Sequence, residues 1–145
     1  MKIRHATIND VNRIAEIEVF NYRINFFPIF KNDEFYFNNL QVINMYSIIK
    51  EHLSKFYVYD DGVVKGFIKV ENDQLKKLFV EPILQNNKIG TKLLQYAVNN
   101  LNVKYLWTLE KNTKAINFYL RNNFKLTNEL KLEEGTNEYL VKLIY

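Results

Sequence analysis

Residues 80–94 join the end of a predicted strand to the start of a predicted helix in a way that suits phosphate binding. The apolar run of residues 78–80 stops before Pro82, amide side chains follow at residues 85–87, and an apolar pattern of helical spacing begins at Ile89. A helix that starts after such a turn leaves backbone N–H groups unpaired and carries about half a positive charge at that end. Phosphate or pyrophosphate fits such a site. The structural alternative is a solvated loop before an ordinary amphipathic helix.

A second group of residues offers acid–base chemistry. Asn112 lies at the entrance of a predicted helix, and Tyr119 shares a face of that helix with Ala115 and Ile116 by its i+4 and i+3 spacing. A phenol, with a reference pKa of about 10, is a candidate general acid for a leaving thiolate, whose thiol has a pKa of about 8.5. The alternative is a core aromatic side chain, since the chain has ten tyrosines.

The elements that must position these groups follow from apolar periodicity and turn residues. Helices are predicted from a capping box at residues 7–10 and from Asn32 or Asp33 to Leu53. The other predicted elements are strands at residues 2–6, 56–59, 63–70, 75–80, 103–109, 124–131 and 138–144 and helices at 89–100 and 113–122. The order β-α-α-β-β-β-α-β-α-β-β predicts an α/β mixture with an antiparallel meander and one parallel crossover.

Composition narrows the chemistry. The 145 residues predict a single domain, residues 1–145, with 48% hydrophobic residues and a net charge of +4 without a basic stripe, so we expect no nucleic-acid partner. The chain has no cysteine, which excludes a disulfide and a cysteine nucleophile. Its two histidines, His5 and His52, are far apart in the sequence, so we expect no metal site. No segment resembles a signal peptide or approaches the roughly 20 apolar residues of a membrane span, so we expect a cytoplasmic protein with no membrane partner.

Two motifs together resemble the GNAT superfamily of acyl-CoA-dependent N-acyltransferases. Residues 80–82 and 85–90 are similar to its Val-x-Pro strand end and its Gln/Arg-x-x-Gly-x-Gly/Ala turn, and residues 112–124 are similar to its Asn-x-x-Ala-x-x-Phe-Tyr-x-x-x-Gly-Phe pattern. Two glycines of those patterns are replaced, by Lys88 and Asn123. If position 88 needs a positive φ, lysine costs about 1 kcal/mol or more there, whereas asparagine is the usual second choice for a left-handed helix end.

The resemblance implies a mostly antiparallel central sheet with a parallel pair at the cofactor cleft and helices on both faces. It implies acetyl-CoA as cofactor and CoA as product. The backbone of Leu78, Phe79 and Val80 would hold the pantetheine arm, Gln85 would brace the loop, and Asn112 would order the arm while Tyr119 meets the sulfur. The N–H groups of residues 86–91 would cradle the pyrophosphate, a set made up of Asn86, Asn87, Lys88, Ile89, Gly90 and Thr91.

Candidates for the general base and for the acceptor pocket come from the positions of acidic and aromatic residues along the chain. Glu71, Glu81 and Glu110 lie near predicted strand ends and are candidate bases for removing the proton of the amine; for each the alternative is a solvated surface charge. Since cysteine and a well-placed histidine are lacking, we expect direct attack in a ternary complex. Among the aromatic residues of positions 20–37, the candidates for lining the acceptor pocket are Tyr22, Phe26, Phe27 and Phe30; the alternative is core packing or a dimer contact.

The sequence therefore predicts an acetyl-CoA-dependent N-acetyltransferase that acts on a primary amine of a small molecule, a peptide or a protein. The alternative is a catalytically silent module that binds acyl-CoA or a partner; a nucleotide-phosphate binder is a third. The aromatic content also predicts a homodimer.

Overall fold

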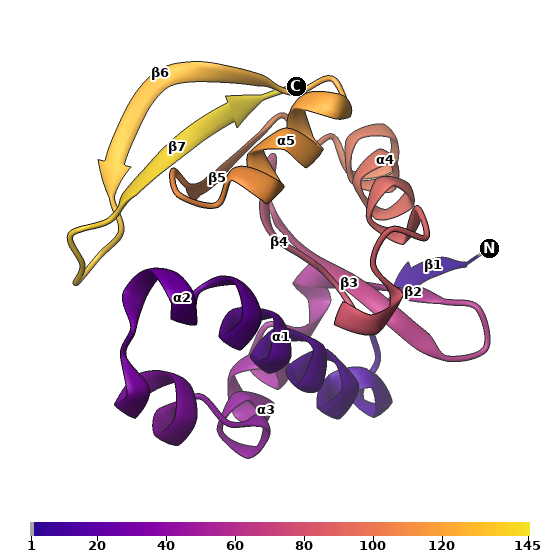
Figure 1. Cartoon of the computed structure of the whole chain (residues 1–145). Helices are drawn as coiled ribbons and strands as arrows, with labels where there is room; N and C mark the ends of the chain where they lie inside the picture. The colour runs from indigo at the N-terminus through magenta and orange to yellow at the C-terminus, as the bar shows by residue number, and fades with distance from the viewer. Residues whose placement is uncertain (1) are drawn as a thin grey trace.

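The computed structural model describes residues 2–145 and folds them around one twisted sheet (Figure 1). The strands are β1 (Ile3–His5), β2 (Phe56–Asp60), β3 (Val64–Glu71), β4 (Gln74–Val80), β5 (Tyr105–Leu109), β6 (Lys125–Leu132) and β7 (Tyr139–Ile144). The α-helices are α1 (Val11–Asn25), α2 (Phe27–Phe30), α3 (Val42–Glu51), α4 (Ile89–Leu101) and α5 (Thr113–Arg121), and the shorter helical turns are η1 (Ile8–Asp10), η2 (Phe35–Asn39), η3 (Leu53–Lys55) and η4 (Pro82–Leu84).

The sheet has the order β1-β2-β3-β4-β5-β7-β6, and every neighbouring pair is antiparallel except β4 and β5. The one parallel pair is connected through α4, as a crossover requires. The predicted fold class, a mixed sheet that is mostly antiparallel with one parallel pair, is confirmed.

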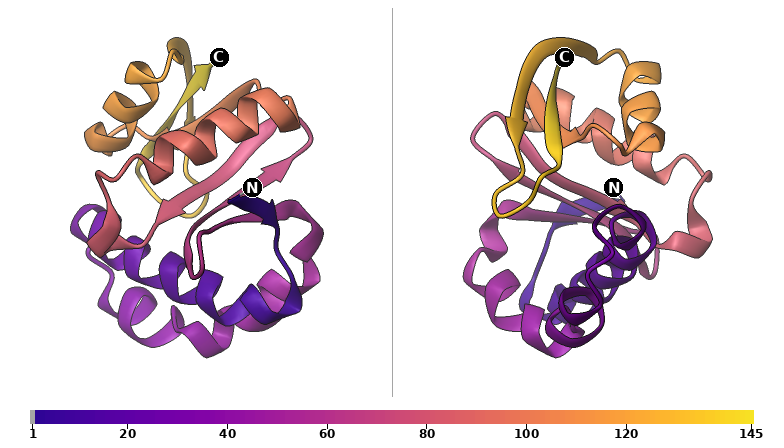
Figure 2. Two further views of the ribbon diagram at one scale, coloured as in Figure 1. Left: turned by 90° about the vertical axis from the view of Figure 1, so that its right-hand side faces the viewer. Right: turned by 60° about the vertical axis from the view of Figure 1, so that its left-hand side comes forward.

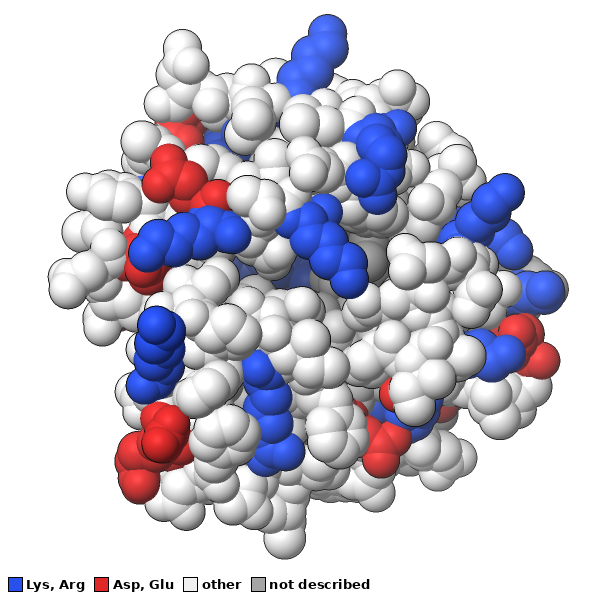
Figure 3. Space-filling view, viewed as in Figure 1, with Lys and Arg blue, Asp and Glu red and all other residues white. Residues whose placement is uncertain are grey.

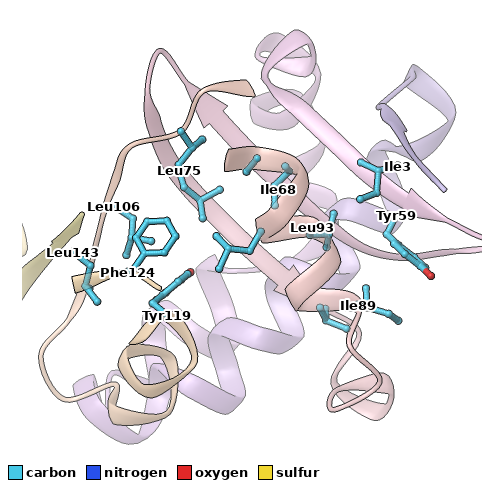
Figure 4. Packing of buried hydrophobic residues seen from close by; sticks show 14 of the residues in the cluster. Ile3, Tyr59, Ile68, Leu75, Ile89, Leu93, Leu106, Tyr119, Phe124 and Leu143 are labelled. Carbon is cyan, nitrogen blue, oxygen red and sulfur yellow. The ribbon is translucent and has the colours of Figure 1, made fainter. Parts of the chain in front are cut away.

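Helices cover both faces of the sheet because its central strands alternate two apolar sets. On β3, Ile68 faces the core under α4 and α5 while Phe67 faces the core under α1 and α3. On β4, Val80 and Phe79 divide in the same way. Figure 2 shows the two helical layers on either side of the sheet, and Figure 4 shows the first core, in which Tyr119 lies beside Phe124.

Gly66 on β3 lies where α4 packs closely against the sheet. A Cβ atom there would lie 3.0 Å from the Leu93 side chain and 3.0 Å from the Phe79 carbonyl oxygen. Because one of these neighbours is backbone, a larger residue would displace the strand that borders the site.

The predicted second helix, from Asn32 or Asp33 to Leu53, is wrong as one element. The chain forms η2, breaks at Leu40 and Gln41, and resumes as α3. The break is fixed from outside the segment, because the Arg23 side chain of α1 donates hydrogen bonds to the carbonyl oxygens of Tyr36 (3.0 Å) and Leu40 (3.1 Å). Local helical periodicity contains no signal of that tertiary contact.

The capping box is confirmed at Thr7 and Asp10, and the seven strands together with α4 and α5 agree with the predicted ranges to within about two residues. The short helices α2, η3 and η4 were not predicted. Across residues 2–145, the structure holds no helix with the length and apolarity that crossing a membrane demands.

Candidate functional site

The parallel strands β4 and β5 separate after a short contact and leave an open edge. They pair only at Gln74 with Tyr105 and at Leu75 with Leu106. Beyond Leu75, β4 keeps β3 as its neighbour on one side, up to the pairing of Val80 with Gly66. The final residues of β4 therefore present unpaired backbone groups to the space between the two strands.

The register identifies which groups those are. The Glu81 N–H donates to the Lys65 carbonyl oxygen at 2.8 Å, so in the alternating antiparallel pattern Phe79 also faces β3, and Leu78 and Val80 face the open edge. The Val80 carbonyl oxygen already accepts a hydrogen bond from Asn21 Nδ2 at 2.9 Å. The groups left for an extended ligand are both backbone groups of Leu78 and the N–H of Val80.

The loop between β4 and α4 ends in a helix N-terminus without a side-chain cap. Asn86 and Lys88 both adopt left-handed conformations, with φ of 71° and 65°. The first intrahelical bond runs from Lys92 N to Lys88 O at 3.0 Å, which leaves the N–H groups of the preceding residues for an anion. Gly90 brings this turn against α5, because a Cβ atom there would lie 3.4 Å from the Phe118 ring.

Gln85 braces this loop, as the resemblance implied. Its Nε2 donates to Asn21 Oδ1 at 3.2 Å, and its Oε1 accepts from Lys114 Nζ at 2.9 Å. Asn21, which is 1% exposed, thus ties α1 both to the end of β4 and to the loop. Sequence reasoning missed Asn21, and its only signal was a polar residue on the apolar face of the first helix.

A first cleft of about 320 Å³ lies over the open edge and the loop. The predicted cofactor residues that line it are Leu78, Phe79, Val80, Gln85, Asn86, Lys88, Ile89, Gly90, Thr91, Asn112 and Tyr119. Asn87 is not brought there; its Nδ2 instead donates to the Leu84 carbonyl oxygen at 3.2 Å. Lys114 and Arg121 of α5 also line this cleft. They were not identified from the sequence, although their seven-residue spacing within the motif of residues 112–124 places both on one face of the helix.

A second cleft, of about 550 Å³, is lined by residues of the α1–η2 region, of β4 and of the turn that joins β6 to β7. Of the predicted acceptor residues, Tyr22, Phe26 and Phe30 line this cleft. Phe27 does not; it packs in the cluster of Val19, Tyr36 and Leu40.

The two clefts share five residues, which are Leu78, Phe79, Asn112, Ala115 and Tyr119. Tyr119 is only 8% exposed, and this burial raises the pKa of its phenol above the ordinary value. The phenol is therefore protonated at neutral pH. Asn112 begins α5, and its Oδ1 accepts a hydrogen bond from Ala115 N at 3.3 Å.

The structure does not bring the three predicted bases to either cleft. Glu71 pairs with Lys55 at 3.2 Å and Glu81 pairs with Arg13 at 2.8 Å, both away from the cleft linings. Glu110 is exposed in the turn after β5 and lines neither cleft. Glu71 lies at the other end of the sheet, where it pairs with Gln74 at the start of β4. Glu81 and Glu110 do follow the cleft ends of β4 and β5, but the side chain of Glu81 is held by Arg13 and neither residue lines a cleft.

A buried ion pair beneath the second cleft was also missed. Glu18 of α1 is completely buried, its Oε1 is paired with Lys77 Nζ of β4, and its Oε2 has no hydrogen-bond partner. Tyr22, one turn further along α1, lines the cleft; burial and the Glu18 charge raise the pKa of its phenol. The i, i+4 spacing of Glu18 and Tyr22 on an apolar helix face was the available signal.

Charge around the site favours an anion in the first cleft. Lys88, Lys114 and Arg121 line it, and no carboxylate is among its lining residues within the described chain. On the face shown in Figure 3, Lys and Arg side chains surround a hollow near the centre of the view, and acidic side chains lie toward the outline.

Lys88→Gly is expected to separate stability from ligand binding. Removing a side chain from a left-handed residue should stabilise the fold by about 1 kcal/mol, or about 2–4 °C in melting temperature for a chain of this size. Loss of the ammonium should weaken CoA binding about ten-fold. Thermal melting and calorimetry measure the two effects.

Lys31→Gly is the matched control for that variant. Lys31 is also left-handed, with φ of 53°, and lines neither cleft. It should raise the melting temperature without changing CoA affinity. A Lys88→Gly protein that bound CoA as tightly as the parent would remove the ammonium from the anion site.

Comparisons with known proteins agree with this geometry. A family model described as an acetyltransferase (GNAT) domain matches residues 52–126. The peptidyl-lysine N-acetyltransferase YjaB of Salmonella typhimurium is 28% identical over 89 residues, which span 61% of this chain and only 61% of that protein.

Solved structures show the same fold over nearly the whole chain. Apo YjaB from Escherichia coli has a TM-score of 0.75 at 18% identity, with 99% of this chain and 95% of that chain covered. A PaiA N-acetyltransferase from Thermoplasma acidophilum, in complex with coenzyme A, has a TM-score of 0.71 at 20% identity, with 99% and 98% covered.

Proposed function

This chain belongs to the GNAT acetyltransferase family, and from that premise we propose that it transfers the acetyl group of acetyl-CoA to a primary amine by direct attack in a ternary complex. The observation that carries the proposal is the junction of two clefts at Tyr119. One cleft has the donors for a diphosphate and an extended arm, and the other has an aromatic lining that suits an organic acceptor.

The residues of the first cleft fit acetyl-CoA. The N–H groups at the start of α4, with Lys88, Lys114 and Arg121, would hold its phosphates. The open edge of β4 at Leu78 and Val80 would hydrogen-bond the pantetheine arm like an added strand. The cofactor supplies an activated acetyl group as a thioester. The related PaiA structure contains coenzyme A, in agreement with this assignment.

Tyr119 is assigned as the proton donor to the leaving sulfur. Its raised pKa makes transfer of its proton to a thiolate unfavourable if nothing replaces that proton. The step becomes favourable when the phenol oxygen also takes up a proton that the attacking nitrogen loses. Tyr119 then acts as a relay from nitrogen to sulfur and ends the step as a phenol.

The alternative is a silent acyl-CoA-binding module. One observation favours it: the five residues shared by the two clefts include no carboxylate and no histidine. In that case the cofactor would bind without reaction.

Calorimetry and thiol release separate these two functions. Titration with acetyl-CoA and with CoA is expected to give low-micromolar binding, because several charge-assisted hydrogen bonds of roughly 1.5–3 kcal/mol each act together. Thiol release from acetyl-CoA is then measured over a panel of amines and lysine peptides. Binding without release on any acceptor would favour the silent module, and no binding at high micromolar concentration would end both assignments.

A peptidyl-lysine acceptor, as named for the relative YjaB, belongs on that panel beside small amines. The homodimer and the cytoplasmic location stay predictions.

A further inference from the structure

The second cleft, which is the proposed acceptor site and is named the acceptor cleft, carries charges on two opposite walls. On the β4 side, Lys77 is neutralised by the buried Glu18, and Lys76 is exposed to solvent, where water screens its charge. On the other side, the β6–β7 turn contributes Glu133 and Glu134. Neither carboxylate forms an ion pair within residues 2–145, whereas Glu129 and Glu138 of the same hairpin do. Glu134 is exposed like Lys76, and Glu133 is half-buried.

Glu133 lines this cleft together with two tyrosines, Tyr22 and Tyr36. The turn that carries it is held in place: the Glu133 N–H donates to the Glu138 carbonyl oxygen at 2.8 Å, and Thr136 Oγ1 donates to the Glu133 carbonyl oxygen at 2.8 Å. Burial and, second to it, the Glu133 charge raise the pKa of Tyr36. The pKa of Tyr22 is raised mainly by burial and by Glu18, and the Glu133 charge makes a smaller contribution in the same direction.

A cation would complete this arrangement. Phenol oxygens and a carboxylate accept hydrogen bonds from an ammonium group, and the surrounding rings of Phe26 and Phe30 suit an aliphatic chain. The reacting amine must lie at the other end of the cleft, at the junction with Tyr119.

We propose that Glu133, together with Tyr22 and Tyr36, forms a subsite for a second ammonium group of the acceptor. The preferred acceptor is then an aliphatic chain that carries two amines, one at the cleft junction and one at Glu133. This inference rests on the proposed function and specifies its acceptor.

The test compares acceptors that differ only in the remote group. Thiol release is measured with diamines from 1,3-diaminopropane to 1,6-diaminohexane, with the monoamines of equal length, and with the matching amino carboxylates. For at least one length, the diamine should exceed the monoamine in kcat/KM by about ten-fold, the factor of one charge-assisted contact. The amino carboxylate should fall below the monoamine.

Glu133→Gln is expected to remove the diamine advantage and to leave kcat/KM for the monoamine and the affinity for CoA unchanged. Glu51→Gln, on the exposed face of α3, is the matched control and should retain the advantage. Equal kcat/KM for diamine and monoamine in the parent, or an advantage that persists in Glu133→Gln, would overturn the subsite.

A binding measurement distinguishes failure of the subsite from failure of the proposed function. The best diamine is titrated calorimetrically into the CoA-loaded protein and into its Glu133→Gln variant. Binding that depends on Glu133 without turnover of any amine would support the subsite and reject the transferase. Turnover without a preference for diamines would support the transferase and reject the subsite.

A peptide pair identifies the source of the second cation. Lysine flanked by arginine is compared with lysine flanked by serine. An arginine advantage that disappears in Glu133→Gln assigns the subsite to a basic peptide, whereas an advantage confined to free diamines assigns it to small polyamines.

Discussion

Tyr119→Phe is expected to lower turnover by about 10²–10⁴-fold, the usual contribution of a positioned general acid. The variant keeps the ring that packs between Phe118 and Phe124 and removes only the hydroxyl at the junction of the two clefts. Cofactor affinity should therefore be unchanged, so the loss should appear in kcat. Thiol release at saturating acetyl-CoA, with calorimetry of CoA binding, measures both quantities.

Tyr46→Phe is the control for that experiment, because Tyr46 lies on α3 and lines neither cleft. It should retain full turnover. If Tyr119→Phe turned over at the parent rate, the proton relay would have to run through another group, and the assignment of Tyr119 would be lost.

Lys77→Met is expected to destabilise the fold by about 3–5 kcal/mol, because it leaves a fully buried carboxylate without its counter-charge. Glu18 is 0% exposed and one of its oxygens already lacks a partner. Urea unfolding at neutral pH, followed by circular dichroism, measures the loss as a lower midpoint at an unchanged slope.

Two further variants separate a buried pair from a surface pair. Lys111→Met removes a cation whose side chain is 64% exposed in its pair with Glu138, and it should cost less than about 1 kcal/mol. The double variant Glu18→Gln, Lys77→Met should recover part of the loss. A single Lys77→Met cost below that of Lys111→Met would mean that water reaches Glu18.

Much of the local structure was predictable because its causes are local. The meander turns, the strand ranges and the start of α4 follow from residue types within a few positions. Asn123 adopts φ of 72°, as expected of an asparagine in place of the glycine that ends a helix. Lys88 adopts φ of 65°, so the motif position does require a left-handed residue even though it carries a side chain.

Other features depended on partners distant in the sequence. The break at Leu40 exists because Arg23 satisfies carbonyl groups there. Asn21 became part of the site through Val80 and Gln85, more than fifty positions away. Glu81 is held away from it by its ion pair with Arg13, and Glu71 lies at the opposite end of the sheet, paired with Gln74. A single sequence shows none of these pairings.

The amino-acid sequence by itself determined the order of elements, the left-handed turn at the start of α4 and the place of Tyr119 on α5, because each depends on short-range periodicity and on the conformational preferences of neighbouring residues. Only the tertiary structure decided how far β4 and β5 separate, that the two clefts meet at Tyr119, that the buried Glu18 pairs with Lys77, and that Glu133 lines the second cleft. Those outcomes depend on packing and on charges from segments that are remote along the chain, and long-range contacts of that kind leave no local pattern from which they can be deduced.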